Sequence, residues 1–254
     1  MSRRSLVVAA VVLTLLVGSV GIAYAITNGE PDGDGHPYVA LVYGPPWLCS
    51  GAAISEDVLV TAAHCFDEPG QAVLVSFESE QQFIWHTGVW HPHPDYCPGC
   101  GPGLKGFDTH DVAVVVLDDP VSLPSYATLP TEGLVDTLPM RQDVDLVGYG
   151  IHGWIRGGGW PFDNDDWDMT RYYAPAELVA SNHVHSAEYI KLTANPAQGK
   201  GGTCFGDSGG PDLLGGTNII LAVNSYVTNM NCTGVTYSNR IDLDYALEFI
   251  NSFP

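Results

Sequence analysis

The sequence has little positive charge. Only nine of its 254 residues are Lys or Arg, against 29 Asp or Glu, so the formal net charge at pH 7 is −20. A surface this acidic repels nucleic acid phosphates and anionic lipid headgroups, which excludes both as partners. The same charge attracts cationic substrates in general, but it does not indicate which of their bonds would react.

The N-terminal apolar run, Leu6–Leu16, is slightly short for a membrane span. Arg3 and Arg4 precede it and Ala23-Tyr24-Ala25 follows it, which is the order typical of a signal peptide and its cleavage site. We therefore expect residues 1–25 to be a signal peptide and the mature protein to be secreted. A twin-arginine export signal and an uncleaved anchor are the alternatives.

A glycine-rich turn surrounds one serine in Gly206-Asp207-Ser208-Gly209-Gly210-Pro211. Glycine permits positive φ and a close approach of the backbone to a ligand. The hydroxyl of Ser208 can then stand free, and neighbouring N–H groups can converge on one point, as an oxyanion hole requires. A plain polar surface turn is the alternative.

A base and an acid that could activate this serine lie upstream. His64 follows the apolar run Val58–Val60, and Asp111 opens the apolar run Val112–Leu117. A serine nucleophile needs a base that a third group orients, and a buried acid needs a partner. The chain order His, Asp, Ser differs from that of subtilisins and of α/β-hydrolases. Asp108 is a weaker candidate for the acid because polar residues follow it.

The motifs Thr61-Ala62-Ala63-His64-Cys65 and Gly206–Pro211 together resemble the trypsin-like (chymotrypsin-fold) serine proteases, from Ile26 almost to the C-terminus. The resemblance implies that Ser208 is the nucleophile, His64 the general base and Asp111 the orienting acid. It implies oxyanion donors at the N–H groups of Gly206 and Ser208. It also implies an endopeptidase that acts on proteins or peptides without metal or organic cofactor. The sequence does not determine the oligomeric state, and we expect a monomer. A catalytically silent binding or adhesion protein on the same scaffold is the alternative.

Short apolar or alternating runs bounded by Gly, Pro and Asp predict an all-β fold. The clearest are 38–43, 58–61, 72–77, 112–117, 144–147, 219–223 and 235–237. The resemblance implies two six-stranded antiparallel β-barrels, and helical spacing predicts a C-terminal α-helix over 242–253. Within one protease domain, 26–254, we expect barrel one over about 26–120 and barrel two over about 131–240, with the link near Pro120–Pro130.

Six cysteines in an exported chain favour disulfides. The resemblance implies the pairs Cys49–Cys65 and Cys204–Cys232. The remaining pair, Cys97 and Cys100, lies near His91 and His93, so a local disulfide or a zinc site is possible, and export favours the disulfide.

Signal cleavage after Ala25 would make Ile26 the first residue of the mature chain. Trypsin-like enzymes pair such a free ammonium with the acid before the nucleophile, and that acid is Asp207 here. Signal peptidase itself would then activate the enzyme. Further trimming, or a frayed terminus, is the alternative.

The resemblance also locates a specificity pocket, whose lining would be Gly202, Thr203, Ser225, Tyr226, Val227 and Gly234. No acid lies between Asn195 and Asp207, so we expect no Lys or Arg preference at P1, the residue before the cleaved bond. Because a valine at position 227 narrows the pocket, we expect a preference for small or medium apolar side chains at P1. If the alignment with the family shifts by one residue, Asn224 also lines the pocket.

The acidic segment Asp163–Asp168 could bind Ca²⁺ but lacks EF-hand spacing, and a solvated turn is favoured.

Overall fold

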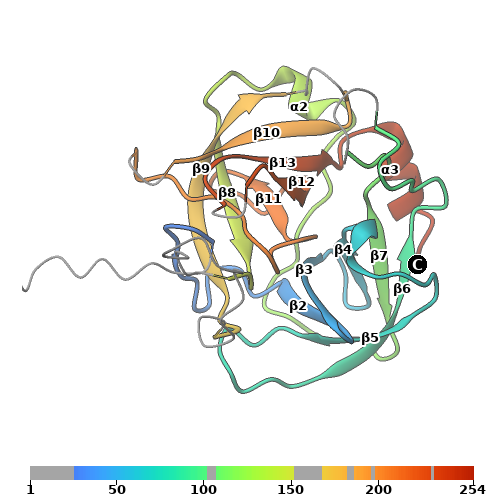
Figure 1. Cartoon of the computed structure of the whole chain (residues 1–254). Coiled ribbons are helices and arrows are strands. Elements are labelled where there is room, and N and C mark those ends of the chain that lie inside the picture. The colour runs from blue at the N-terminus through green and yellow to red at the C-terminus, as the bar shows by residue number, and fades with distance from the viewer. Residues whose placement is uncertain (1–25, 102–106, 152–167, 182–185, 196–197, 230–231) are drawn as a thin grey trace, which may run out of the picture.

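The computed structural model describes residues 26–101, 107–151, 168–181, 186–195, 198–229 and 232–254. The expected signal peptide lies outside these ranges, and so does most of the acidic segment 163–168. No helix within them has the length and hydrophobicity of a membrane-spanning segment. The described residues form two closed antiparallel barrels, which confirms the predicted fold class (Figure 1).

Barrel one contains the first six long strands of the chain. They pair in the order β2-β3-β4-β7-β6-β5, and the pairing of β5 with β2 closes the barrel. The strands are β2 (Val39–Gly44), β3 (Trp47–Ala53), β4 (Val58–Thr61), β5 (Ala72–Ser76), β6 (His86–Pro92) and β7 (Ala113–Leu117).

Barrel two is closed by the pairing of β8 with β9, in the order β9-β10-β13-β12-β11-β8. The short strand β1 (Glu30–Pro31) adds to its edge at β9. The six strands of the barrel are β8 (Asp143–Gly148), β9 (Tyr172–Ala180), β10 (Tyr189–Ala194), β11 (Pro211–Leu214), β12 (Ile220–Val227) and β13 (Gly234–Arg240).

Burial along the strands shows where the barrels meet. Strand β9 alternates between buried and half-exposed residues because one face lines barrel two and the other faces solvent. Strands β2 and β4 are buried on nearly every residue. In β2 both faces are covered, since it contacts β8 of barrel two as well as its own barrel. The two barrels therefore pack directly against each other through buried residues.

Two helices complete the described structure: α2 (Leu134–Thr137) and α3 (Asp244–Ile250). Helix α3 packs back on barrel one, with Phe249 against His93 (Figure 1). It is shorter than the predicted 242–253. The Asp242 carboxylate accepts hydrogen bonds from the Val135 N–H and from Arg240, which holds that residue outside the helix. The segment Pro120–Pro130, expected to link the barrels, lies between β7 and α2.

A buried arginine ties the two barrels together. Arg171, just before β9, donates to the Asp32 carboxylate at 2.7 Å and to the Gly33 carbonyl at 2.6 Å. The same guanidinium donates at 3.0 Å to the carbonyls of Val39 and Phe77 in barrel one. Arginine suits this position because its planar fork satisfies several acceptors at once.

Replacing this arginine should destabilise the fold. In Arg171→Met the Asp32 carboxylate, only 2% exposed, loses one of its two ionic partners and keeps His36 at 2.6 Å. We expect the free energy of unfolding, measured in urea, to fall by about 3 kcal/mol. The control is Arg141→Met, whose 77% exposed side chain pairs with Glu177; its loss should stay below about 1 kcal/mol. Equal losses in the two variants would contradict the assignment.

Candidate active site

His64 lies at the boundary between the barrels. Strand β4 ends at Thr61, and His64 follows in the short 3-10 helix η1 (Ala63–Cys65). Ala62 and Ala63 are fully buried, which lets this turn pack closely against barrel one. The Cys49–Cys65 disulfide ties it to β3. The imidazole itself remains 25% exposed, so a ligand can reach it.

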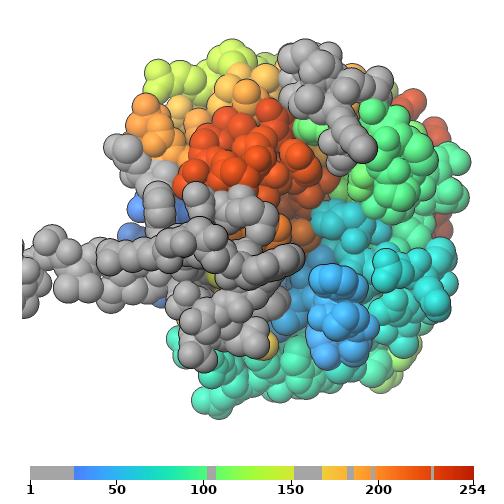
Figure 2. All heavy atoms as spheres, viewed as in Figure 1, coloured from blue at the N-terminus to red at the C-terminus, as the bar shows by residue number. Residues whose placement is uncertain are grey.

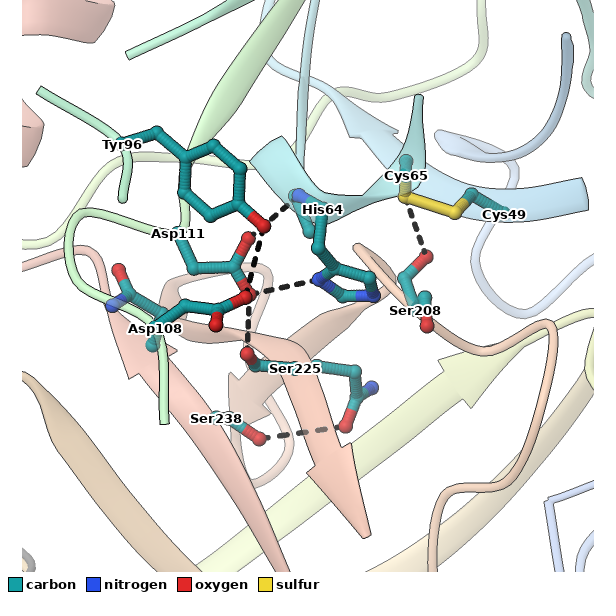
Figure 3. Close-up of polar contacts among 12 residues, drawn as sticks. Cys49, His64, Cys65, Tyr96, Asp108, Asp111, Ser208, Ser225 and Ser238 are labelled. Carbon is teal, nitrogen blue, oxygen red and sulfur yellow. Dashed lines mark hydrogen bonds and ion pairs between the residues drawn. A yellow bond between two sulfur atoms is a disulfide. The ribbon is translucent and has the colours of Figure 1, made fainter. Parts of the chain in front are cut away.

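Asp111, immediately before β7, is fully buried and holds His64 by two hydrogen bonds. Its Oδ1 accepts the His64 backbone N–H at 2.9 Å, and its Oδ2 accepts from His64 Nδ1 at 2.8 Å (Figure 3). Ser225 Oγ also donates to Oδ2. Burial raises the pKa of Asp111, but the charge and hydrogen bonds of His64, with the bond from Ser225, outweigh it, so the pKa lies below its usual value.

This contact determines the tautomer and the basicity of His64. A carboxylate only accepts hydrogen bonds, so Nδ1 carries the proton and Nε2 is left as the acceptor. Burial lowers the pKa of His64, but the charge and hydrogen bond of Asp111 outweigh that effect and raise it above its usual value. The imidazole lies between Asp111 and Ser208 (Figure 3). The arrangement is that of an oriented base next to a hydroxyl.

The turn that carries Ser208 can be built only with glycine at two positions. Gly206 and Gly209 have φ of 96° and 76°, which strains any residue with a side chain. A Cβ on Gly209 would lie 2.1 Å from Thr61 Oγ1 of barrel one. The Ser50 N–H donates to the Ser208 carbonyl at 2.8 Å, so the turn is anchored to barrel one.

The backbone N–H groups of Gly206 and Ser208 belong to the same turn as the Ser208 hydroxyl. Within the described ranges neither N–H donates to a protein acceptor, although the N–H groups of Asp207, Gly209 and Gly210 all do. Unpaired donors at a surface turn remain available to a ligand oxygen. The local geometry is therefore compatible with stabilising an anion beside Ser208.

Two cavities meet at Ser208, and His64 and Phe205 line both. The first, about 480 Å³, extends over barrel two. The second, about 520 Å³, extends towards Trp47 and the Cys49–Cys65 disulfide of barrel one. Figure 2 shows this face, where blue and teal atoms of barrel one meet orange atoms of barrel two. An extended chain could thus pass over the hydroxyl.

The first cavity contains four of the six residues expected to line a specificity pocket. These four are Thr203, Ser225, Tyr226 and Val227. The other two lie outside its lining. Gly202 is buried in a bridge with Thr27, and Gly234 is exposed at the start of β13. Asn224, which a shift of one residue would bring in, also lines the cavity.

Asp207 is buried next to the nucleophile turn. Its carboxylate accepts the N–H groups of Gly150 and Cys204, both at 2.8 Å. Burial raises its pKa to about 7, and the two hydrogen bonds oppose that rise without cancelling it. Ile26 is fully buried, and Thr27 beside it exchanges hydrogen bonds with Gly202. A buried acid without a cation among the described residues is suited to receive one.

The remaining sequence-predicted residues lie as follows. All six cysteines are in disulfides, in the pairs Cys49–Cys65, Cys97–Cys100 and Cys204–Cys232. Within the described ranges, no three His, Cys, Asp or Glu side chains form a metal-binding group.

Asp108 accepts hydrogen bonds from the Tyr96 hydroxyl at 2.9 Å and from the Gly99 N–H at 2.6 Å, and it hydrogen-bonds to neither nitrogen of His64. Of the acidic segment, only Asp168 is described.

One functional contact was not predicted from the sequence. Ser225 was expected in the pocket lining, and its hydroxyl also holds Asp111, which is 114 residues away in the chain. Nothing in the local sequence around Ser225 indicates that contact. Only the closing of barrel two against barrel one brings the two residues together.

Known proteins resemble this chain in sequence and in fold. A family model described as Trypsin matches residues 26–250. The chain is 30% identical over 260 residues to the cercarial protease of Schistosoma mansoni, covering 90% of each chain. It is 26% identical over 198 residues to kallikrein 1-related peptidase b27 of Mus musculus, covering 70% of each. The solved structure of HL collagenase is similar with a TM-score of 0.68 and 18% identity, covering 89% of this chain and 96% of that one, which shows the fold.

The elevated pKa of His64 can be tested by substitution. Asp111→Asn removes the charge but leaves the burial, so the pKa of His64 should fall below its usual value. An NMR titration of the imidazole measures this fall. The control is Asp108→Asn, which removes a carboxylate that acts on His64 only through its charge. It should lower the pKa less, and an equal fall in both variants would contradict the pairing.

Proposed function

The chain belongs to the trypsin family and is a serine endopeptidase, and on this premise we propose that Ser208, His64 and Asp111 carry out its chemistry. The observation that best supports the proposal is the buried Asp111 carboxylate, which accepts two hydrogen bonds from His64 beside Ser208. Such an arrangement orients the imidazole as a base towards the hydroxyl.

In the proposed mechanism Ser208 Oγ attacks the carbonyl carbon of the scissile peptide, and His64 Nε2 takes the hydroxyl proton. Asp111 stabilises the resulting imidazolium and does not itself become protonated. His64 then gives its proton to the leaving amine, and an acyl-enzyme forms on Ser208. Water, deprotonated by the same imidazole, releases the acid and regenerates the serine.

The oxyanion of each tetrahedral intermediate would be held by the N–H groups of Gly206 and Ser208. Their lack of a protein acceptor within the described residues supports this role. Because they belong to a turn held by Gly209 against Thr61 and by Ser50, they need little rearrangement when the charge develops. The mechanism assigns no step to a metal or organic cofactor.

We infer cleavage without Lys or Arg preference at P1. The described residues that line the first cavity include no Asp or Glu, so a cationic side chain would meet no opposite charge there. Val227 and Thr203 both line this cavity. The substrates are proteins or peptides, as in the family.

We also propose that the enzyme is secreted, with residues 1–25 removed and 26–254 as one monomeric protease domain without stable membrane association. Three disulfides fit an extracellular protein. The ammonium of Ile26 would then pair with Asp207. The burial of Ile26 and the elevated pKa of Asp207 support this pairing, since an adjacent cation would favour the ionised carboxylate.

The nucleophile is tested by Ser208→Ala. This variant should fold normally, fail to react with a fluorophosphonate, and lose several orders of magnitude in the rate of peptide hydrolysis. Ser122→Ala, which alters an exposed serine within the segment Pro120–Pro130, is the matched control and should keep both properties. Wild-type hydrolysis by Ser208→Ala would overturn the assignment.

The activation pair is tested at the N-terminus of the secreted protein. The first Edman cycle should release Ile, and a chain with one extra Ser before Ile26 should lose about 100-fold or more in activity, because its ammonium no longer fits beside Asp207. Pairing raises the pKa of the ammonium, so activity should be full at neutral pH and fall as pH rises past that value. Full activity in the extended chain would rule out the pairing.

A further inference from the structure

The interior of barrel two contains three buried polar residues, one of which, Asn224, lines the first cavity. Asp212 of β11, Asn224 of β12 and Ser238 of β13 are 0%, 2% and 0% exposed. Elsewhere the same barrel is filled by apolar side chains such as Leu146 and Leu192. Polar groups in such a core destabilise the fold unless they are paired, so their position next to a cavity points to a role.

Asp212 has no cation to neutralise it among the described residues. Ser238 and Asn224 face its carboxyl, but neither oxygen meets the full geometry of a hydrogen bond with a described group. The charged group that acts on it is Asp207, which has the same sign. Burial, together with Asp207, raises the pKa of Asp212 to about 8. At neutral pH the carboxyl is therefore mostly protonated, and it can both donate and accept a hydrogen bond.

Asn224 connects this acid to the cavity. Asn224 lines the cavity, its Nδ2 donates to the Gly210 carbonyl at 3.2 Å, and Ser238 Oγ donates to its Oδ1 at 3.4 Å. A carboxamide has two N–H donors and two acceptor sites on its oxygen. The second N–H faces the Asp212 carboxyl, so one acceptor site on Oδ1 is left for a further partner.

We propose that Asn224, positioned by Asp212 and Ser238, makes the specificity pocket prefer a P1 side chain that ends in a carboxamide. The proposal rests on the proposed function of Ser208 and its partners. Asn224 is the pocket residue that would touch the substrate, and Asp212 is a positioning residue that acts through it.

The chemistry of the pocket favours a carboxamide over the alternatives. The NH₂ group of a glutamine or asparagine side chain can donate a hydrogen bond to the unused acceptor site of Asn224 Oδ1. An apolar side chain of the same size would leave that acceptor site buried without a donor. A charged side chain would find no opposite charge among the described lining residues, apart from His64 for an anion. Pockets that are largely apolar with a few placed polar groups obtain their selectivity in this way.

The experiment uses the secreted enzyme and peptides that differ only at P1, in two pairs of similar size, Gln against Met and Asn against Leu. For the wild type we expect kcat/KM to be about tenfold higher for the carboxamide in at least the better-fitting pair. Asn224→Leu should reverse that preference. If the wild type cleaves the apolar member of both pairs equally well or better, the proposal is overturned.

The role of Asp212 is tested by two substitutions in the same assay. Asp212→Asn keeps a donor and an acceptor and should retain the preference, whereas Asp212→Leu should lose it. Asp145→Asn is the control, since this buried acid accepts from Tyr173 and Gly216 instead, and its P1 profile should not change. A preserved preference in Asp212→Leu would overturn the positioning role.

Titration with a fluorophosphonate separates this inference from the proposed function. The reagent reacts with Ser208 without needing a P1 side chain, so it counts the competent sites in each variant. Normal labelling with no carboxamide preference overturns only the role of Asn224. Absence of labelling in the wild type overturns the proposed function itself.

Discussion

The site depends on one carboxylate at the boundary between the two barrels. Asp111 is fully buried, and its donors come from both sides of that boundary, His64 from barrel one and Ser225 from barrel two. An ionised acid in such a position is stable only while these donors remain in place. The same hydrogen bonds therefore orient the base and couple the two barrels. Arg171 reinforces that coupling at another part of the boundary.

Three fully buried acids near the site differ in how well they are paired. Asp111 has hydrogen bonds from His64 and Ser225 and the charge of the imidazole, and its pKa lies below the usual value. Asp207 has two backbone N–H groups, and its pKa is about 7. Asp212 has no complete hydrogen bond, and its pKa is about 8. All three acids are fully buried, so the hydrogen-bond donors and charges around each one decide whether its pKa is lowered or raised.

The strands show how far the local sequence could be interpreted. The apolar run Val112–Leu117 predicted β7 to within one residue, since an uninterrupted buried strand has a clear pattern. The run Ile219–Val223 predicted only the first part of β12, which continues to Val227. Polar Asn224 and Ser225 end the apolar run, but ladder pairing with β13 extends through them across a register shift. Strand β9 was not singled out, because Pro175 interrupts its alternating pattern.

The sequence by itself determined the kinds of groups at the site. The glycines around Ser208, the small residues before His64 and the apolar run after Asp111 each constrain the backbone locally, so their chemistry could be recognised without coordinates. The tertiary structure decided which distant residues support them: Ser225 donates to Asp111, and the Ser50 N–H donates to the Ser208 carbonyl. These contacts arise because closing a barrel brings strands far apart in the chain side by side, and no local pattern records which side chains then meet.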